Sequence, residues 1–156
     1  MLYSEKIYNR IAEFLDKEEW KYFFDKDKGT IALGVNLSGK ISETKMIIDL
    51  GEEEYIVLGM IALKVSSSYR VEIIKLLNKI NYGMKFGCFE MDDEDGEIRF
   101  RIAVDCEGCI PSLQVVKKSI IVPALMIQKY GDEILNVMLG VKDAESAYEA
   151  AERQKK

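Results

Sequence analysis

The sequence predicts a single α+β domain with an antiparallel β-sheet of about six strands and helices packed on it. Three observations predict this class. Pairs of segments in which apolar and polar residues alternate are joined by short polar turns, as in β-hairpins. Segments with apolar residues at helical spacing precede, separate and follow these pairs. The 156 residues contain no linker-like change in composition, so one domain is expected.

The first element is a helix over residues 3–17. Its apolar side chains recur at the spacing of one helix face: Ile7, Ile11, Phe14 and Leu15. Ser4 precedes them and is a suitable N-cap, because its hydroxyl can accept a hydrogen bond from a backbone N–H of the first turn.

Two hairpins follow, formed by residues 20–25 with 30–38 and by residues 46–50 with 55–65. A four-residue loop in the first hairpin gives three facing pairs: Phe24 and Ile31, Tyr22 and Leu33, Trp20 and Val35. The strand at 55–65 is apolar on both faces. We therefore expect it to be central in the sheet or to lie at an interface.

A second helix and a third hairpin come next. The helix ends near Gly83, and its apolar stripe is predicted to be Val71, Ile74, Leu76, Leu77 and Ile80. The hairpin joins 85–92 to 97–106. Its register gives five facing pairs: Met91 and Ile98, Phe89 and Phe100, Gly87 and Ile102, Glu90 and Arg99, Cys88 and Arg101.

A long helix starts at Pro111 and runs to Gly140, and Pro123 inside it is expected to kink or break it. Residues 141–156 form a charged, alanine-rich tail, predicted to be a frayed helix with disordered last residues. The domain therefore spans 1–140, in the order α-β-β-β-β-α-β-β-α.

Composition excludes several function classes. The chain has no histidine, which removes Ser-His-Asp and Cys-His nucleophiles and His-ligated zinc. The net charge of −5 argues against a nucleic-acid partner. No apolar run approaches the roughly 20 residues of a membrane span, and the N-terminus does not resemble a signal peptide. Three cysteines, an odd number, predict reduced thiols and a cytoplasmic location.

The carboxylates do not predict a metal or cofactor site. The acidic turn at 92–97 resembles a calcium loop, but Met91 and Ile102 stand where the end ligands belong, so a solvated hairpin tip is expected. Asp49 lies among apolar neighbours. We expect it to pair with Lys45, Lys64 or a basic partner rather than to act in catalysis.

Two further candidate sites each have more than one interpretation. Arg99 and Arg101 could bind an anion in a small-ligand sensor, although Glu90 opposite Arg99 explains that arginine without a ligand. Cys106 and Cys109 form a CxxC pair, which could serve a thiol-redox protein, form a regulatory disulfide or be incidental. A shared metal is disfavoured, because Cys88 would lie ~15 Å along the strand at 3.3 Å per residue.

The most informative feature is an excess of apolar residues over what one core can hold. The second face of the sheet still carries Phe23, Ala32, Ile47, Ile56, Leu58, Met60 and Ala62. Contiguous apolar patches on globular proteins usually meet a partner. We predict a protein-binding or dimer surface made by Phe23, Ile47, Ile56, Leu58 and Met60. The alternative is that the C-terminal helix or the tail covers this face.

Four sequence strings resemble the YbjN domain family: LLNKINY at 76–82, FGCFEMD at 86–92, DGEIRFR at 95–101 and LNVMLG at 135–140. The resemblance covers about residues 18–140. It implies a fold similar to type III secretion chaperones, which are often dimeric, and the family label of a bacterial sensory transduction regulator. It supplies no catalytic residues. We therefore predict a non-enzymatic protein-binding module, chaperone-like or regulatory, that forms a homodimer and binds another protein.

Overall fold

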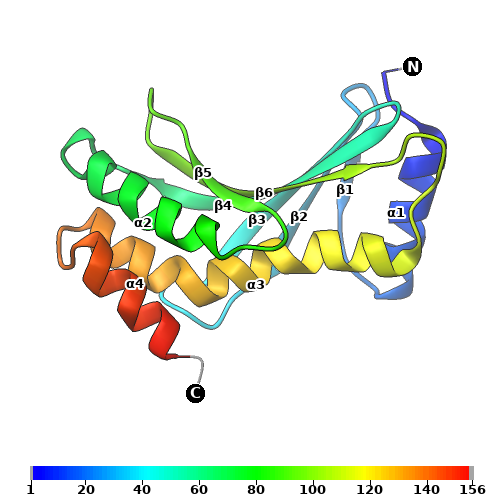
Figure 1. Cartoon of the computed structure of the whole chain (residues 1–156). Coiled ribbons are helices and arrows are strands. Elements are labelled where there is room, and N and C mark those ends of the chain that lie inside the picture. The colour runs from blue at the N-terminus through cyan, green and yellow to red at the C-terminus, as the bar shows by residue number, and fades with distance from the viewer. Residues whose placement is uncertain (1, 155–156) are drawn as a thin grey trace.

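One six-stranded antiparallel sheet forms the centre of the molecule, with strand order β1-β2-β3-β4-β6-β5. The computed structural model describes residues 2–154 (Figure 1). Its elements are α1 (Glu5–Lys17), β1 (Phe23–Asp25), β2 (Thr30–Asn36), β3 (Glu43–Leu50), β4 (Glu54–Lys64), η1 (Ser67–Tyr69), α2 (Arg70–Tyr82), β5 (Cys88–Met91), β6 (Glu97–Asp105), α3 (Leu113–Met138) and α4 (Ala144–Arg153). The predicted α+β class is confirmed, with a short 3-10 helix in addition, and α4 is the helix expected in the C-terminal tail. The strand β4 is central, between β3 and β6.

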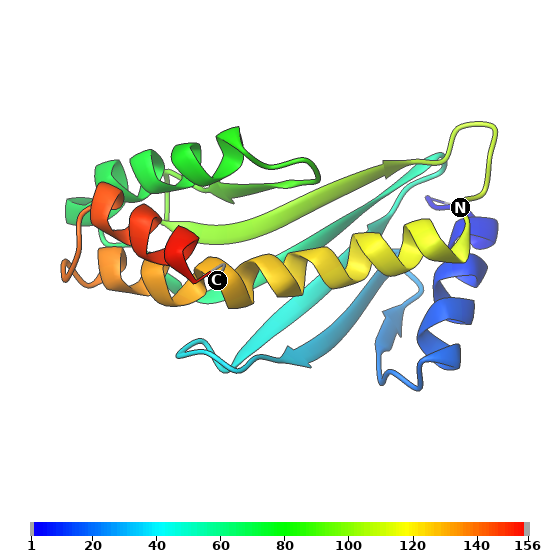
Figure 2. The same ribbon diagram turned by 60° about the horizontal axis from the view of Figure 1, so that its bottom comes forward.

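The core lies on one side of the sheet and falls into two clusters. The first packs α1 and the beginning of α3 against β2, β3 and β4. Here the predicted face of α1 is buried, and Ser4 accepts a hydrogen bond from the Ile7 amide at 3.4 Å. The second packs α2, α4 and the rest of α3 against β4, β5 and β6. All four helices therefore cover the same face (Figures 1 and 2).

The first hairpin is shorter than predicted. Phe24 faces Ile31 as expected, but the ladder ends at the pair of Phe23 and Ala32, so Tyr22 and Trp20 do not pair with β2. The reason lies at the end of α1. Glu19 has a positive φ of 57°, and the Trp20 amide donates to the Leu15 carbonyl at 2.9 Å, which keeps Trp20 beside the helix.

The third hairpin has the predicted register from Cys88 to Met91, while Gly87 lies outside the ladder. Gly87 has a positive φ of 72°, so the chain turns away from β6 there. Asn81 of α2 forms two hydrogen bonds with the backbone of the edge strand β5. Its amide nitrogen donates to the Phe89 carbonyl and its amide oxygen accepts from the Phe89 N–H, both at 2.8 Å. The side chain thus occupies backbone groups that an edge strand would otherwise expose.

The buried face of α2 differs from the prediction. Ile73, Leu76, Leu77 and Ile80 are buried, whereas Val71 and Ile74 are 65% and 49% exposed. Both stripes have helical spacing. The orientation that places Ile73 and Leu77 on the sheet turns Val71 and Ile74 outward.

The helix α3 continues through Pro123, so the predicted break is wrong. It begins after Ser112, whose hydroxyl accepts from the Val115 amide at 3.3 Å. Pro123 is buried where α3 crosses β4. A Cβ on Gly59 of β4 would lie 3.2 Å from the Pro123 Cβ and 2.8 Å from Ile127 Cδ1. Packing on the sheet at both sides of the proline holds the two halves in one helix.

The tail predicted to be a frayed helix contains the helix α4, which packs on α2 and α3 along its length. Asp143 caps it by accepting from the Ser146 amide at 2.8 Å. Its buried residues are Ala144, Ala147 and Ala151, whose small side chains allow close helix packing. The disorder predicted for the last residues falls partly on 155–156, outside the described residues. Within 2–154, no helix is both long and apolar enough to cross a bilayer.

The contact between α3 and β4 gives a testable prediction. Gly59→Ala should lower the free energy of unfolding by about 1–3 kcal/mol, because the new methyl group overpacks the contact with Pro123 and Ile127. Urea unfolding measures this. Gly34→Ala on β2 is the matched control, because a Cβ there meets nothing within 4 Å. Equal stability of Gly59→Ala and the wild type would contradict the described packing.

Candidate protein-docking face

The sheet has one face that no helix of the described chain covers. In Figure 1 α3 and α4 lie below the sheet, α1 stands at its right-hand end and no helix lies above it, and Figure 2 shows α3 crossing in front of the covered side. Because side chains alternate along a strand, every second residue points to the bare side. We call this surface the open face. Along β1 to β4 it includes Phe23, Ala32, Lys45, Ile47, Asp49, Ile56, Leu58 and Met60, and along β6 and β5 it includes Arg99, Arg101, Ala103, Cys88 and Glu90.

The predicted surface residues gather in the middle of the open face. Phe23, Ala32, Ile47 and Leu58 stand side by side across four strands, and Ile56 and Met60 flank Leu58 on β4. We call these six residues the apolar centre. Phe23 is 68% exposed, and the other five are half-buried. Ala62 is exposed and lies where the β4–β6 register shifts between Ile61 and Lys64, so it does not join the centre.

The candidate anion site at the β5–β6 end already has a carboxylate partner. Arg99 Nε lies 2.9 Å from Glu90 Oε2, the predicted cross-strand pair, and Arg101 Nη1 lies 3.7 Å from Glu90 Oε1. A hollow of about 350 Å³ beside them is lined by Glu90, Met91, Asp92, Glu97 and Arg99. Three carboxylates in this lining disfavour an anionic ligand.

Two charges on β3 stand on either side of Ile47. Lys45 and Asp49 are both exposed, and among residues 2–154 neither forms an ion pair. Neither lysine named as a partner of Asp49 pairs with it: Lys45 lies four residues along the same strand, and Lys64 pairs with Asp95. A basic partner from outside this chain is the remaining prediction.

The cysteines occupy three different environments. Cys106 is buried, Cys88 is half-buried and Cys109 is exposed, and all three thiols are free. Burial raises the pKa of the Cys106 thiol, and the nearby Asp105 carboxylate raises it further. Burial also raises the pKa of Cys88. A raised pKa disfavours the thiolate that redox chemistry requires.

The acidic turn after β5 uses its carboxylates to build the turn. Asp92 accepts from the Glu94 amide at 2.8 Å, and Asp95 accepts from the Glu97 amide at 2.9 Å and pairs with Lys64. In the part of the chain that the structure describes, no three His, Cys, Asp or Glu side chains are grouped as metal ligands.

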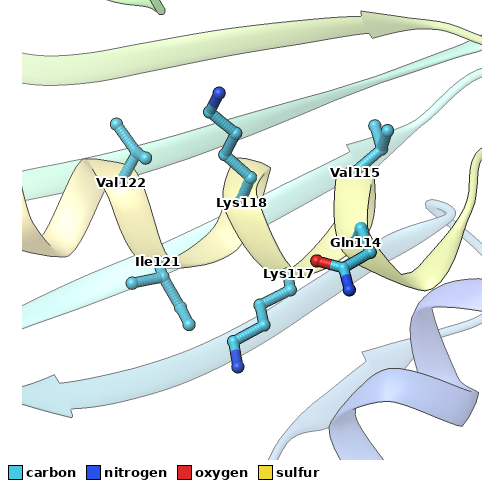
Figure 3. A pocket seen from close by; sticks show the side chains of 6 residues that line it. All are labelled: Gln114, Val115, Lys117, Lys118, Ile121 and Val122. Carbon is cyan, nitrogen blue, oxygen red and sulfur yellow. The ribbon is translucent and has the colours of Figure 1, made fainter.

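The sequence interpretation missed a surface on α3. A hollow of about 400 Å³ is lined by Gln114, Val115, Lys117, Lys118, Ile121 and Val122, and Figure 3 shows Lys117 and Lys118 pointing to opposite sides of the helix. Lys118 Nζ lies 3.3 Å from the ring centroid of Phe86. One sequence feature could have indicated this surface: α3 has apolar residues at positions that do not face the sheet. Val115 and Leu125 are examples, and they are 42% and 49% exposed.

The comparisons with known proteins agree with this fold. The family model described as "YbjN: Putative bacterial sensory transduction regulator" matches residues 8–116, more than half of the chain. The chain belongs to the YbjN family. The match starts earlier and ends earlier than the resemblance at 18–140, so the LNVMLG segment lies outside it. A comparison with curated proteins found no match.

A solved structure described as "Crystal structure of YbjN, a putative transcription regulator from E. coli" is similar to this chain with a TM-score of 0.55. The two sequences are 15% identical, and the match covers 78% of this chain and 88% of that chain. Likeness at this identity concerns the fold alone. The family description names a regulator and no enzymatic activity.

The cysteine environments predict a clear order of reactivity. Under iodoacetamide at mildly alkaline pH, Cys109 should be alkylated first, while Cys106 reacts slowly because it is buried and its pKa is raised. Mass spectrometry of timed samples measures this, and Cys109→Ser should remove the fast phase. Equally fast labelling of Cys106, or its rapid loss into a disulfide with Cys109, would instead support a redox pair.

Proposed function

We propose that this YbjN-family chain is a non-enzymatic protein-binding module, chaperone-like or regulatory, that holds another polypeptide on its open face. The observation that carries the proposal is the uncovered apolar centre. Large side chains such as Leu58 and Met60 stand on a sheet whose other side already packs all four helices. Covering apolar surface yields about 25 cal/mol per Å², so a polypeptide that shields this centre binds favourably.

Two tyrosines have raised pKa values, and the contacts of both are structural. The pKa of Tyr55 is raised to about 12 by burial, and its hydroxyl lies 2.8 Å from Ser119 Oγ between β4 and α3. The pKa of Tyr22 is also raised to about 12, by burial and by its hydrogen bond to Asp16. Both tyrosines therefore stay protonated near neutral pH and join parts of the fold to one another.

The two other candidate functions have weaker support. An anion sensor would need Arg99 and Arg101 to leave Glu90, and the adjoining hollow is lined by carboxylates. A thiol-redox protein would need a reactive thiolate, which the buried Cys106 disfavours. We also propose a cytoplasmic location, in keeping with the three free thiols.

Substitutions on the two sides of the molecule test the proposal. Full-length wild type, Leu58→Glu on the open face and Ile74→Glu on α2 are immobilised, and proteins captured from native cytoplasm are identified. The affinity of a purified captured protein is then measured for each variant. We expect Leu58→Glu to weaken binding at least tenfold, about 1.4 kcal/mol, because a carboxylate would be buried against the partner.

Ile74→Glu is the matched control, because Ile74 is 49% exposed on the helical side and its substitution should leave the affinity unchanged. Circular dichroism verifies that both variants are folded. If Leu58→Glu leaves the affinity unchanged, or if only Ile74→Glu abolishes binding, the open face is not the docking surface.

A further inference from the structure

We propose that the edge of β6 beside α3 binds an extended segment of another protein, which carries a carboxylate and adds to the sheet as a further strand in line with β5. This edge is separate from the apolar centre of the open face, so the inference does not rest on the proposed function. It is carried by unpaired backbone groups of β6, by an adjoining hollow and by the position of Lys118.

The short strand β5 leaves part of β6 without a neighbour. Their ladder ends at the pair of Cys88 and Arg101, whereas β6 continues to Asp105. Gly87 ends the ladder: its φ is 72°, and a Cβ at this position would lie 2.6 Å from the Arg101 carbonyl oxygen. The chain before β5 therefore turns away, and residues 102–105 of β6 have a neighbouring strand on the β4 side only.

The backbone groups that point to this edge belong to Ala103 and Asp105. In an antiparallel ladder, the N–H and C=O groups of successive residues point alternately to the two neighbouring strands. The Cys106 amide donates to the Glu53 carbonyl at 2.7 Å, on the β4 side. Ala103 and Asp105 therefore present their groups on the other side, and both residues are exposed. Among residues 2–154, no backbone hydrogen bond from the loop before β5 reaches them.

The edge of β5 next to it is covered. Exposed strand edges are templates for pairing with another chain, and proteins commonly protect them. Asn81 protects β5 by its two hydrogen bonds to the Phe89 backbone. The edge at Ala103 has no such cover within the described residues. It therefore offers donors and acceptors to an extended polypeptide, as in β-strand addition.

A hollow of about 370 Å³ follows this edge. Its lining takes in residues 102–105 of β6, Phe86 of the loop before β5, and Val115, Lys118 and Ser119 of α3. Successive side chains of a strand point to opposite faces, so a hollow lined by four successive residues lies at the strand edge itself. An added strand would bury every second side chain against Phe86 and Val115, which favours apolar residues at those positions.

Lys118 adds a preference for an acidic side chain. Its Nζ lies 3.3 Å from the Phe86 ring centroid, and in Figure 3 it points to the same side of α3 as Val115 and Val122, while Lys117 points away. Among residues 2–154, Lys118 forms no ion pair. A carboxylate on the added strand would meet this ammonium group beside the hollow, whereas a basic side chain would be repelled.

The Asp105 carboxylate does not neutralise this lysine. It belongs to the open-face side of β6 and accepts from the Glu107 amide at 2.9 Å, in the turn that follows the strand. Asp105 instead disfavours acidic residues on that side of the added strand, because like charges on neighbouring strands repel. The expected occupant therefore has apolar residues and a carboxylate toward α3 and uncharged polar residues toward the open face.

Amide exchange on the full-length protein tests the inference. Phage-displayed random peptides are selected on immobilised wild type, and each enriched sequence is synthesised. NMR then follows the exchange of individual backbone amides with and without each peptide. We expect a peptide that slows exchange at Ala103 and Asp105 at least tenfold. Exchange at Ile102 and Val104 should hardly change, because their amides point to β4.

Charge reversal on α3 tests the role of Lys118. Lys118→Glu should weaken the binding of this peptide at least tenfold, because two carboxylates then meet. Lys117→Glu is the matched control: Lys117 is exposed on the same helix and points to the other side, so its reversal should leave the affinity unchanged. Circular dichroism verifies that both variants are folded.

The inference is overturned if no enriched peptide protects Ala103 and Asp105, if the protected amides of β6 do not alternate, or if Lys118→Glu binds as tightly as Lys117→Glu. These results are distinct from a failure of the proposed function. A peptide that protects the β6 edge and still binds Leu58→Glu supports the edge site, whatever the open face binds. If Leu58→Glu abolishes the binding of every peptide and the β6 edge stays unprotected, the open face stands and the edge site is excluded.

Discussion

The close contact of α3 with β4 at Gly59 places the longest helix directly on one side of the sheet, and the other packing follows from it. A residue with a side chain at position 59 would meet Pro123 and Ile127, so the helix could not lie as near. With α3 in this place, α1 packs at one end of the same side and α2 and α4 at the other. The described chain therefore has no helix left for the opposite side, although β3 and β4 carry apolar side chains there as well.

The open face combines apolar surface with a defined charge order. An apolar patch without charges would favour unspecific association, because the hydrophobic effect has no direction. Lys45 and Asp49 on either side of Ile47 add direction, since only a partner with the complementary order avoids like-charge contacts. The same two residues keep the strand polar at both ends while the face is uncovered. A regulator that works through protein contacts requires this kind of selectivity.

Much of this architecture could be predicted from alternation and turns. The facing pairs of the third hairpin and the residues of the apolar centre follow from a period of two, which assigns side chains to faces without knowledge of the fold. Periodicity does not say which other element of the fold packs against a face. For that reason the prediction for α2 is wrong at Val71 and Ile74: two apolar stripes compete on this helix, and the structure buries the one that contains Ile73. The helix in the C-terminal tail is predicted from its composition, but its packing is not, because its alanines become a packing surface only beside α2 and α3. A proline inside a helix predicts a kink or a break, but α3 is not broken, because the sheet supports it on both sides of Pro123.

The most direct test of the account is whether Met60 becomes shielded when a polypeptide binds the open face. Methionine oxidation depends on access of the oxidant to the sulfur atom, and peptide mass spectrometry follows each methionine separately. Met126 on α3 is half-buried on the helical side and serves as the internal reference. The account predicts that oxidation of Met60 slows when a captured partner protein is added in excess, while oxidation of Met126 does not change. Equal oxidation rates of Met60 with and without the bound partner would place the interface elsewhere and contradict the account.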